Sequence, residues 1–267
     1  MTTLGDLERY YDAVPRVGGA RAEDFGPLTL FVQEDPTGWQ YYARPTLGGT
    51  APVTPADVER VLERQRELKV PQAFEWVAET TPGLRAAVEA AGVPVHSHPL
   101  MVLDPAAAPA PPHPDVRLFG PQDPLLLAAV TVPMLAFASP GTATGETGLP
   151  ELARQMADPG SEVRRAYVAR KLADGRTGLA AAVRDGTVLC SGQYNPAGDV
   201  AEVVGVGTLP AARRQGLALG VTAALVAAAR TAGARHVFLS AGDEDVARIY
   251  TKAGFRRAGT ALIAELG

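Results

Sequence analysis

The stretch LPAARRQGLALG, residues 209–220, stands between an apolar run typical of a strand and an Ala-rich run typical of a helix. It contains two arginines and two glycines, and no acidic residue. The first N–H groups of a helix have no partner inside it, and the helix dipole favours negative charge there. Glycine lets the backbone approach a ligand closely. The stretch therefore predicts a cradle for a phosphate or pyrophosphate group.

The spacing in this stretch differs from two common phosphate-binding loops, G-x-x-x-x-G-K-[ST] and G-x-G-x-x-G. What stands here is Arg213-x-x-Gly216-x-Ala218 after a strand. This element resembles motif A of the GNAT superfamily of acyl-CoA-dependent N-acyltransferases. A second stretch, DEDVARIYTKAGFRRAGT at 243–260, resembles the family's helix with a tyrosine, followed by Gly-Phe and a final strand. The resemblance covers most of residues 115–267.

The resemblance implies that acetyl-CoA is the co-substrate and that no metal takes part. The backbone of Val206, Gly207 and Thr208 would pair with the pantetheine arm as an added strand does. The N–H groups of residues 213–218 would hold the pyrophosphate of CoA. The implied CoA-binding set is Val206, Gly207, Thr208, Arg213, Arg214, Gln215, Gly216, Leu217 and Ala218.

Acyl transfer from a thioester to an amine needs a neutral amine, a stabilised oxyanion and a proton for the departing thiolate. By the resemblance, Tyr250 is the acid that protonates the thiolate; alternatively, its ring only packs its helix against the sheet. Glu202 is the candidate base, or else a solvated glutamate at a strand end. It lies four residues before Val206, which predicts that both face the same side of the strand. The N–H of Gly207, or of a neighbour, is the candidate oxyanion donor.

Other residue types offer weaker candidates for catalysis. Cys190 is the single cysteine, and a lone cysteine in a strand is usually a small buried hydrophobe rather than a nucleophile. His96 and His98 share a strand face, but the sequence provides no evident third metal ligand. We therefore expect direct attack of the amine in a ternary complex.

Strand, helix and loop patterns predict an α/β fold with an internal duplication. Residues 39–104 have the order strand–helix–strand–helix–strand, and residues 200–265 repeat it. Gly205 and Gly207 predict a bulge or a close backbone approach in the strand at 200–209. The remaining expected elements are a helix at 123–137 kinked at Pro133, a loop at 138–150 bordering the acceptor, and antiparallel strands within 167–196 with turns at Asp174-Gly175 and Asp185-Gly186.

A Pro-rich stretch, DPAAAPAPPHP at 104–114, predicts a linker. We expect a degenerate GNAT-like domain at 1–104, a linker at 105–114 and a catalytic GNAT domain at 115–267. The N-terminal half is considered degenerate because LGGTAPVTP at 47–55 has no arginine and has prolines where N–H donors are needed. The expected fold is a mixed, mostly antiparallel GNAT-type sheet flanked by helices. We expect its first half to have no working cofactor site.

Composition narrows the classes of partner. The net charge is −4, with 9 basic and 15 acidic residues in 1–114, so we expect neither nucleic acid nor membrane as a partner. One cysteine, no signal peptide and no apolar run of ~20 residues predict a soluble cytoplasmic protein. The acceptor is expected to be a small-molecule or peptide amine, and the protein a monomer or homodimer. A non-catalytic acyl-CoA sensor or scaffold, and a longer acyl donor, stay open.

Overall fold

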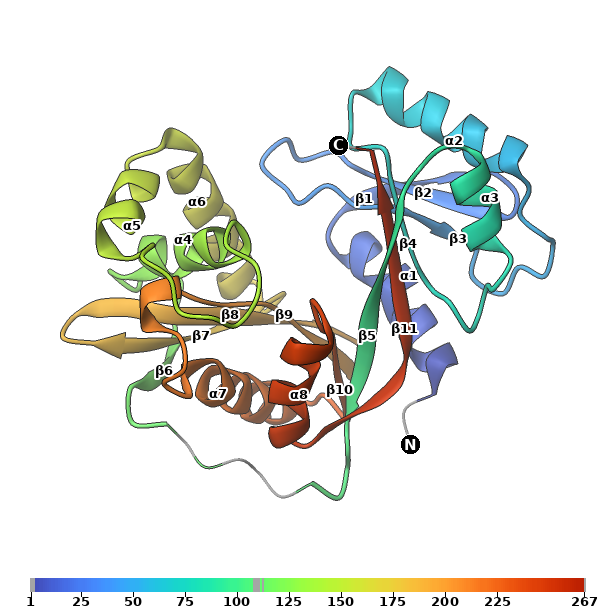
Figure 1. Cartoon of the computed structure of the whole chain (residues 1–267). Coiled ribbons are helices and arrows are strands. Elements are labelled where there is room, and N and C mark those ends of the chain that lie inside the picture. The colour runs from blue at the N-terminus through green and yellow to red at the C-terminus, as the bar shows by residue number, and fades with distance from the viewer. Residues whose placement is uncertain (1–2, 108–110, 112, 267) are drawn as a thin grey trace. The chain divides into compact units, whose positions relative to one another are not determined.

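The computed structural model describes residues 3–107, 111 and 113–266 (Figure 1). The chain divides into two compact units. Unit 1 comprises Met1–Leu100, Ser240–Gly242 and Arg257–Gly267, and unit 2 comprises Met101–Leu239 and Asp243–Arg256. Residues 240–242 and 257–267 were expected in the second domain, but they group with unit 1. The predicted linker at 105–114 lies partly outside the described residues.

Unit 1 is a sheet with strand order β1-β2-β3-β4-β11. Leu28 and Leu30 pack with Val58 of α2 in the core, whereas Phe31 lies under Arg16 of α1, 5.1 Å from its ring centroid to the guanidinium. Because neighbouring strand residues face opposite sides, α1 covers one face and α2 and α3 the other (Figure 1). The elements are α1 (Leu4–Val17), β1 (Ala20–Asp24), β2 (Leu28–Gln33), β3 (Ala43–Pro45), α2 (Pro55–Leu68), β4 (Ala73–Val77), α3 (Leu84–Ala90), β5 (Val95–Leu103) and β11 (Phe255–Glu265).

Unit 2 is a sheet with strand order β10-β9-β8-β7-β6, joined by the end of β5. The pair β9–β10 is parallel, and the pairs β8–β9, β7–β8 and β6–β7 are antiparallel. Helices α4, α5 and α6 cover one face of this sheet, and α7 and α8 cover the other (Figure 1). The elements are β6 (Val116–Phe119), α4 (Leu126–Phe137), α5 (Leu149–Met156), α6 (Pro159–Ala173), β7 (Gly178–Arg184), β8 (Thr187–Ala197), β9 (Val200–Thr208), the 3-10 turn η1 (Pro210–Ala212), α7 (Leu217–Thr231), β10 (His236–Ser240) and α8 (Glu244–Lys252).

The repeated element order is confirmed, but the final strands are exchanged between units. One run is β3-α2-β4-α3-β5, and the other is β9-α7-β10-α8-β11. The end of β11 belongs to unit 1, where Leu262 lies opposite Trp76 of β4, while residues 101–103 of β5 belong to unit 2. The mixed, mostly antiparallel fold is as predicted.

Two turns expected from Asp-Gly pairs have different outcomes. Asp185 and Gly186 have φ angles of 49° and 73° and connect β7 to β8, as a tight hairpin requires. The expected strand before Asp174 is wrong, because these residues form the end of α6. The side chain of Asp158 caps that helix by accepting the N–H of Gly160 at 2.8 Å, so the helix signal was Asp158 followed by proline.

Helix α4 has no charged residue, which is also typical of a membrane-spanning helix. Its 12 residues are, however, far fewer than the ~20 that a bilayer span needs. It packs against β8 and β9 on one side and against α5 and α6 on the other, so most of its side chains are buried. The hydroxyl of buried Thr131 donates to the carbonyl of Leu127 at 2.7 Å. Within the described part of the chain, none of the helices is long and apolar enough to cross a membrane.

The exchanged strand generates a stability prediction. Leu262 of β11 is 3% exposed in the core of unit 1, so we expect Leu262→Ala to lower the free energy of unfolding by about 2–5 kcal/mol. Ile263 is only partly buried, and Ile263→Ala is the matched control with a smaller loss. Chemical denaturation of the whole chain measures both. Equal losses in the two variants would contradict this packing of β11.

Candidate functional site

Strand β9 has one edge that is paired only at its beginning. Its parallel pairing with β10 starts at Val200↔His236 and ends at Glu202↔Phe238. On its other edge, β9 stays paired with β8 as far as Thr208. Among the described residues, no strand pairs with the outer edge of β9 after Glu202. The backbone groups along 203–208 that face this edge are therefore able to bind an extended ligand.

A bulge interrupts the pairing of β9 with β8 along the same segment. Gly205 and Val206 together lie opposite the single residue Gly192. Gly205 has a φ of 63°, which L-residues with a side chain rarely adopt. A Cβ on Gly207 would lie 2.7 Å from the Cα of Pro133 in α4, so only glycine fits there. The bulge and the close approach predicted from these two glycines are both present.

The bulge reverses the alternation of side chains along β9. Glu202 lies opposite Asn195, on the same face of β8 as Ser191. The hydroxyl of Ser191 donates to the carbonyl of Ala129 at 2.5 Å, so this is the face covered by α4. Val206 lies on the other face, toward α7. The prediction that Glu202 and Val206 share a face is therefore wrong, because the extra residue shifts the alternation by one.

The backbone direction also separates neighbouring residues of β9. The N–H of Leu209 donates to the carbonyl of Leu189 at 2.9 Å. Because backbone groups alternate in direction along a strand, Gly207 also directs its N–H toward β8, and Thr208 directs its N–H toward the open edge. As an oxyanion donor, a neighbour of Gly207 therefore fits this geometry better than Gly207 itself.

Tyr250 lies on α8 in a buried environment. Its ring contacts Phe255 edge-on, with centroids 6.1 Å apart, and 8% of the residue is exposed. Burial and the neighbouring Cys190 raise the pKa of the Tyr250 phenol, so it keeps its proton. Thr208, at the end of β9, lies directly opposite Cys190 in the ladder. Tyr250 is therefore near the end of β9, on the face opposite Glu202.

Burial decides the chemistry of Cys190 itself. The thiol is fully buried, and desolvation raises its pKa to about 12. A thiolate is the reactive form of cysteine, and it is almost absent here at neutral pH. The expectation that Cys190 is a small buried hydrophobe agrees with this environment.

The segment between β9 and α7 forms a concave turn. Arg214 and Gly216 have φ angles of 68° and 78°, in the left-handed region. Gly216 is the N-cap of α7, without a side-chain cap and with no acidic residue in the first turn. Alternating backbone conformations of this kind direct consecutive N–H groups inward, where they attract an anion. The geometry fits the predicted pyrophosphate cradle.

The two arginines of the cradle have different surroundings. The guanidinium of Arg213 donates to the carbonyls of Ala136, Ser139 and Ala143 at 3.0, 2.5 and 3.0 Å. These hydrogen bonds hold the loop that follows α4 in place. Arg214 is exposed, and in the described part of the chain its guanidinium has no hydrogen-bond or ion-pair partner. Arg214 is therefore the cation available to a ligand.

The remaining cradle residues are held by neighbouring elements. Gln215 accepts a hydrogen bond from Arg184 at 2.8 Å. Leu217 is buried in the packing of α7, and Ala218 is partly buried. The side chains of these residues therefore support the backbone, and their N–H groups at the helix start are what a ligand would meet.

The loop expected to border the acceptor is attached to the cradle. The N–H of Gly145 donates to the carbonyl of Pro210, and the N–H of Ala211 donates to the carbonyl of Thr147, both at 3.1 Å. A pocket of about 340 Å³ lies between α4 and α5, the two helices that this loop connects. Its lining residues are Leu135, Glu151, Arg154, Gln155 and Asp158.

Sequence reasoning missed a polar pair on the same face as Glu202. Lys171 of α6 donates from Nζ to Oδ1 of Asn195 at 2.9 Å. Asn195 is the residue opposite Glu202 in the ladder. The pair was missed because residues 167–173 were expected to form a strand; Asp158 and Pro159 were the signal for a helix.

The corresponding strand of unit 1 carries a buried arginine. β3 and β4 are parallel and share the single registered pair Ala43↔Phe74. The next residue, Arg44, is 4% exposed and lies 3.4 Å from Glu8 and 3.5 Å from Glu75. Burial raises the pKa of Glu75. The Arg44 guanidinium is thus buried on the side of the sheet that α1 covers, where it also lies 4.2 Å from the ring centroid of Tyr11.

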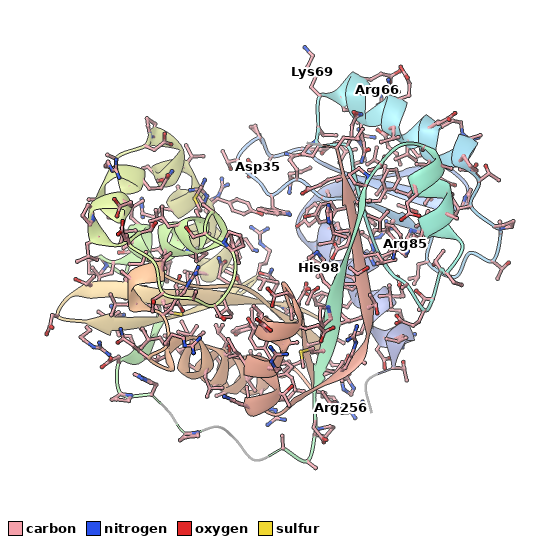
Figure 2. All side chains as sticks on the ribbon, in the orientation of Figure 1. Asp35, Arg66, Lys69, Arg85, His98 and Arg256 are labelled. Carbon is pink, nitrogen blue, oxygen red and sulfur yellow. The ribbon has the colours of Figure 1, made fainter. Side chains whose placement is uncertain are left out.

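The two histidines considered as metal ligands lie in β5. His98 is labelled in Figure 2. Its Nδ1 is 3.0 Å from the carbonyl oxygen of Gly242. Among the residues that the structure describes, no three His, Cys, Asp or Glu side chains are grouped as metal ligands. We assign no role in catalysis to His96 or His98.

Residues 150–255 match the family model described as "Acetyltransferase (GNAT) family". Among solved structures, a GCN5-related N-acetyltransferase from Kribbella flavida is 23% identical, with a TM-score of 0.65, over 96% of this chain and 94% of that one. A GNAT-family acetyltransferase from Colwellia psychrerythraea is 15% identical, with a TM-score of 0.53, over 100% and 98%. These similarities show the fold over nearly the whole chain. No curated protein has significant sequence similarity to it.

The contacts of Arg213 generate a prediction about stability. We expect Arg213→Met to destabilise the protein by about 1–3 kcal/mol, because three carbonyls lose a charged donor. Cleavage within 138–148 by a protease should become faster, as measured by mass spectrometry. Arg214→Met is the matched control and should change neither quantity. Unchanged cleavage in the Arg213 variant would show that the loop is held by other contacts.

Proposed function

The chain belongs to the GNAT family of acetyltransferases through residues 150–255, and from this premise we propose that it transfers the acetyl group of acetyl-CoA to a primary amine. The observation that carries the proposal is the open edge of β9, which leads into the start of α7, where no side chain caps the N–H groups. An extended chain with a pyrophosphate at one end matches both features. The acceptor is a small-molecule or peptide amine.

Acetyl-CoA, as a substrate, would use backbone more than side chains. The pantetheine amides would pair with the open edge along Val206, Gly207 and Thr208, through those backbone groups of the segment that point away from β8. The pyrophosphate would accept hydrogen bonds from the N–H groups of residues 213–218, with Arg214 as the nearby positive charge. Arg213 would contribute by holding the acceptor loop against this segment.

The chemistry divides between the two faces of the sheet. On the face of α4 and α6, Glu202 would accept a proton from the attacking amine, directly or through water. The nitrogen attacks the thioester carbonyl, the C–S bond breaks, and the CoA sulfur leaves as a thiolate. On the face of α7 and α8, Tyr250 would donate its proton to that sulfur. A raised pKa suits this role, because the phenol is protonated before the reaction.

Direct attack in a ternary complex is favoured over a covalent acetyl-enzyme. A covalent route needs an activated nucleophile. Cys190 is fully buried, with a pKa of about 12, and does not meet this requirement. The N-terminal half is proposed to be a degenerate GNAT-like domain, because residues 47–55 contain no arginine and the start of α2 is closed by the capping box of Thr54 and Asp57.

The cradle is tested by a charge reversal at Arg214. We expect Arg214→Glu to raise the Kd for CoA ~10–100-fold, the effect of losing one hydrogen bond to a charged group. The turnover at saturating acetyl-CoA should change little, because the pyrophosphate is bound equally in the ground and transition states. Calorimetry with the full chain measures the affinity. An unchanged Kd would remove Arg214 from the site.

The acid is tested by Tyr250→Phe. We expect unchanged acetyl-CoA affinity and a kcat lower by ~10²-fold, because a proton donor acts only as the thiolate departs. Since the raised pKa keeps the phenol protonated, the parent enzyme should show no alkaline loss of kcat near the usual pKa of tyrosine. Steady-state kinetics over a pH series measures both.

A control variant and two contrary outcomes test the role of Tyr250 and the function of the protein. Phe255→Leu tests the packing contact without removing the hydroxyl and should leave kcat close to the parent value. A Tyr250→Phe variant as active as the parent would make the tyrosine structural. If the parent binds acyl-CoA but acetylates none of a broad amine panel, a non-catalytic acyl-CoA sensor is the better description.

A further inference from the structure

Lys171 is a cation in an unusual setting. It lies in the last turn of α6 and is partly buried. Burial, together with the nearby charge of Arg176, lowers the pKa of its ammonium to about 8. Nζ lies 5.8 Å from the ring centroid of Tyr167 and 2.9 Å from Oδ1 of Asn195. Both partners are uncharged, so they compensate only part of the lost hydration.

Two basic residues near Lys171 in the sequence have carboxylate partners. Arg165 pairs with Glu162, and Arg176 pairs with Asp174 at 2.8 Å. Within the described residues, Lys171 makes no ion pair with a carboxylate. A partly buried charge without a counter-ion costs stability, and such groups are concentrated at binding sites.

Lys171 contacts Asn195 of β8, and the proposed base Glu202 lies on the neighbouring strand β9. Asn195 and Glu202 are directly opposite each other in the antiparallel ladder, so their Cα atoms are ~4.5–5.5 Å apart. Both side chains are on the face covered by α4 and α6. An amine that reaches Glu202 therefore brings its neighbouring groups, within about 5–10 Å, toward Nζ of Lys171.

From this juxtaposition we propose that the acceptor is an amine that also carries a carboxylate, and that Lys171 binds this carboxylate. The inference rests on the proposed acetyl transfer and specifies its substrate class. A bound carboxylate would give Lys171 the ion-pair partner that it does not have among the described residues. Asn195 then acts as a positioning residue that holds the ammonium beside Glu202.

A purely structural role for Lys171 makes a different prediction. If Lys171 only connects α6 to β8, replacing it changes stability and affects all acceptors alike. If it binds a carboxylate, the replacement affects acceptors according to their charge. The test is therefore a ratio between matched acceptors rather than a single rate.

The test uses a panel of ω-amino acids from glycine to 6-aminohexanoate, each paired with its carboxamide. With the full chain and acetyl-CoA, we expect kcat/KM for the best carboxylate to exceed that of its amide ~10–100-fold. Lys171→Met should reduce this ratio to near one while the rate with the amide is kept, and Lys171→Arg should retain part of it. Lys69→Met is the matched control, since Lys69 is exposed and extends away from the chain (Figure 2).

A binding measurement separates this inference from the proposed function. The chain has three lysines, Lys69, Lys171 and Lys252, so acetic anhydride labelling of each can be followed by mass spectrometry. An ω-amino acid should slow the labelling of Lys171, and its amide should not. Protection without any enzymatic acetylation would refute acetyl transfer but support the carboxylate site. Equal ratios in the parent and Lys171→Met, or no selective protection at any chain length, would overturn the inference.

Discussion

The early end of pairing between β9 and β10 is the constraint on which the site depends. Unpaired backbone at a sheet edge is normally covered or shielded, because each buried N–H or C=O without a partner costs free energy. Here the pairing stops at Glu202 while β9 continues to Thr208. The bulge at Gly205 adds twist at the same segment, and α4 presses closely on Gly207. An extended ligand that pairs with this edge would complete the sheet.

The separation of the proposed acid, Tyr250, from the proposed base, Glu202, follows from the same geometry. A sheet is one backbone thick, so residues on opposite faces lie in different environments while remaining close together. Tyr250 is buried beside Cys190 and keeps its proton, whereas Glu202 is only partly buried among polar groups. Two titratable groups with contrasting surroundings are a common arrangement for acid–base catalysis. An opening between β9 and β10 would allow the amine and the leaving thiol to use different faces.

The two runs of strand–helix–strand–helix–strand have the same element order but differ in the residues at the start of the first helix. In unit 2, the strand before α7 leads into uncapped N–H groups and an exposed arginine. In unit 1, the strand before α2 places Arg44 between two carboxylates and over Tyr11, 4.2 Å from the guanidinium to the ring. The start of α2 is closed by the capping box of Thr54 and Asp57. The capping box satisfies N–H groups at the start of α2 that an anion would otherwise meet.

The sequence by itself determined the features whose signals are local. The Thr54-Pro55 helix start, the Asp185-Gly186 hairpin, the glycines of β9 and the spacing of the cradle each act within a few residues, through capping, positive φ or steric fit. The tertiary structure alone decided the exchange of β11, the unequal roles of Arg213 and Arg214, and the face on which Val206 lies. Strand pairing and side-chain partners join residues far apart in the chain, and one bulge inverts every later side chain. Such choices depend on the assembled core rather than on neighbouring residues.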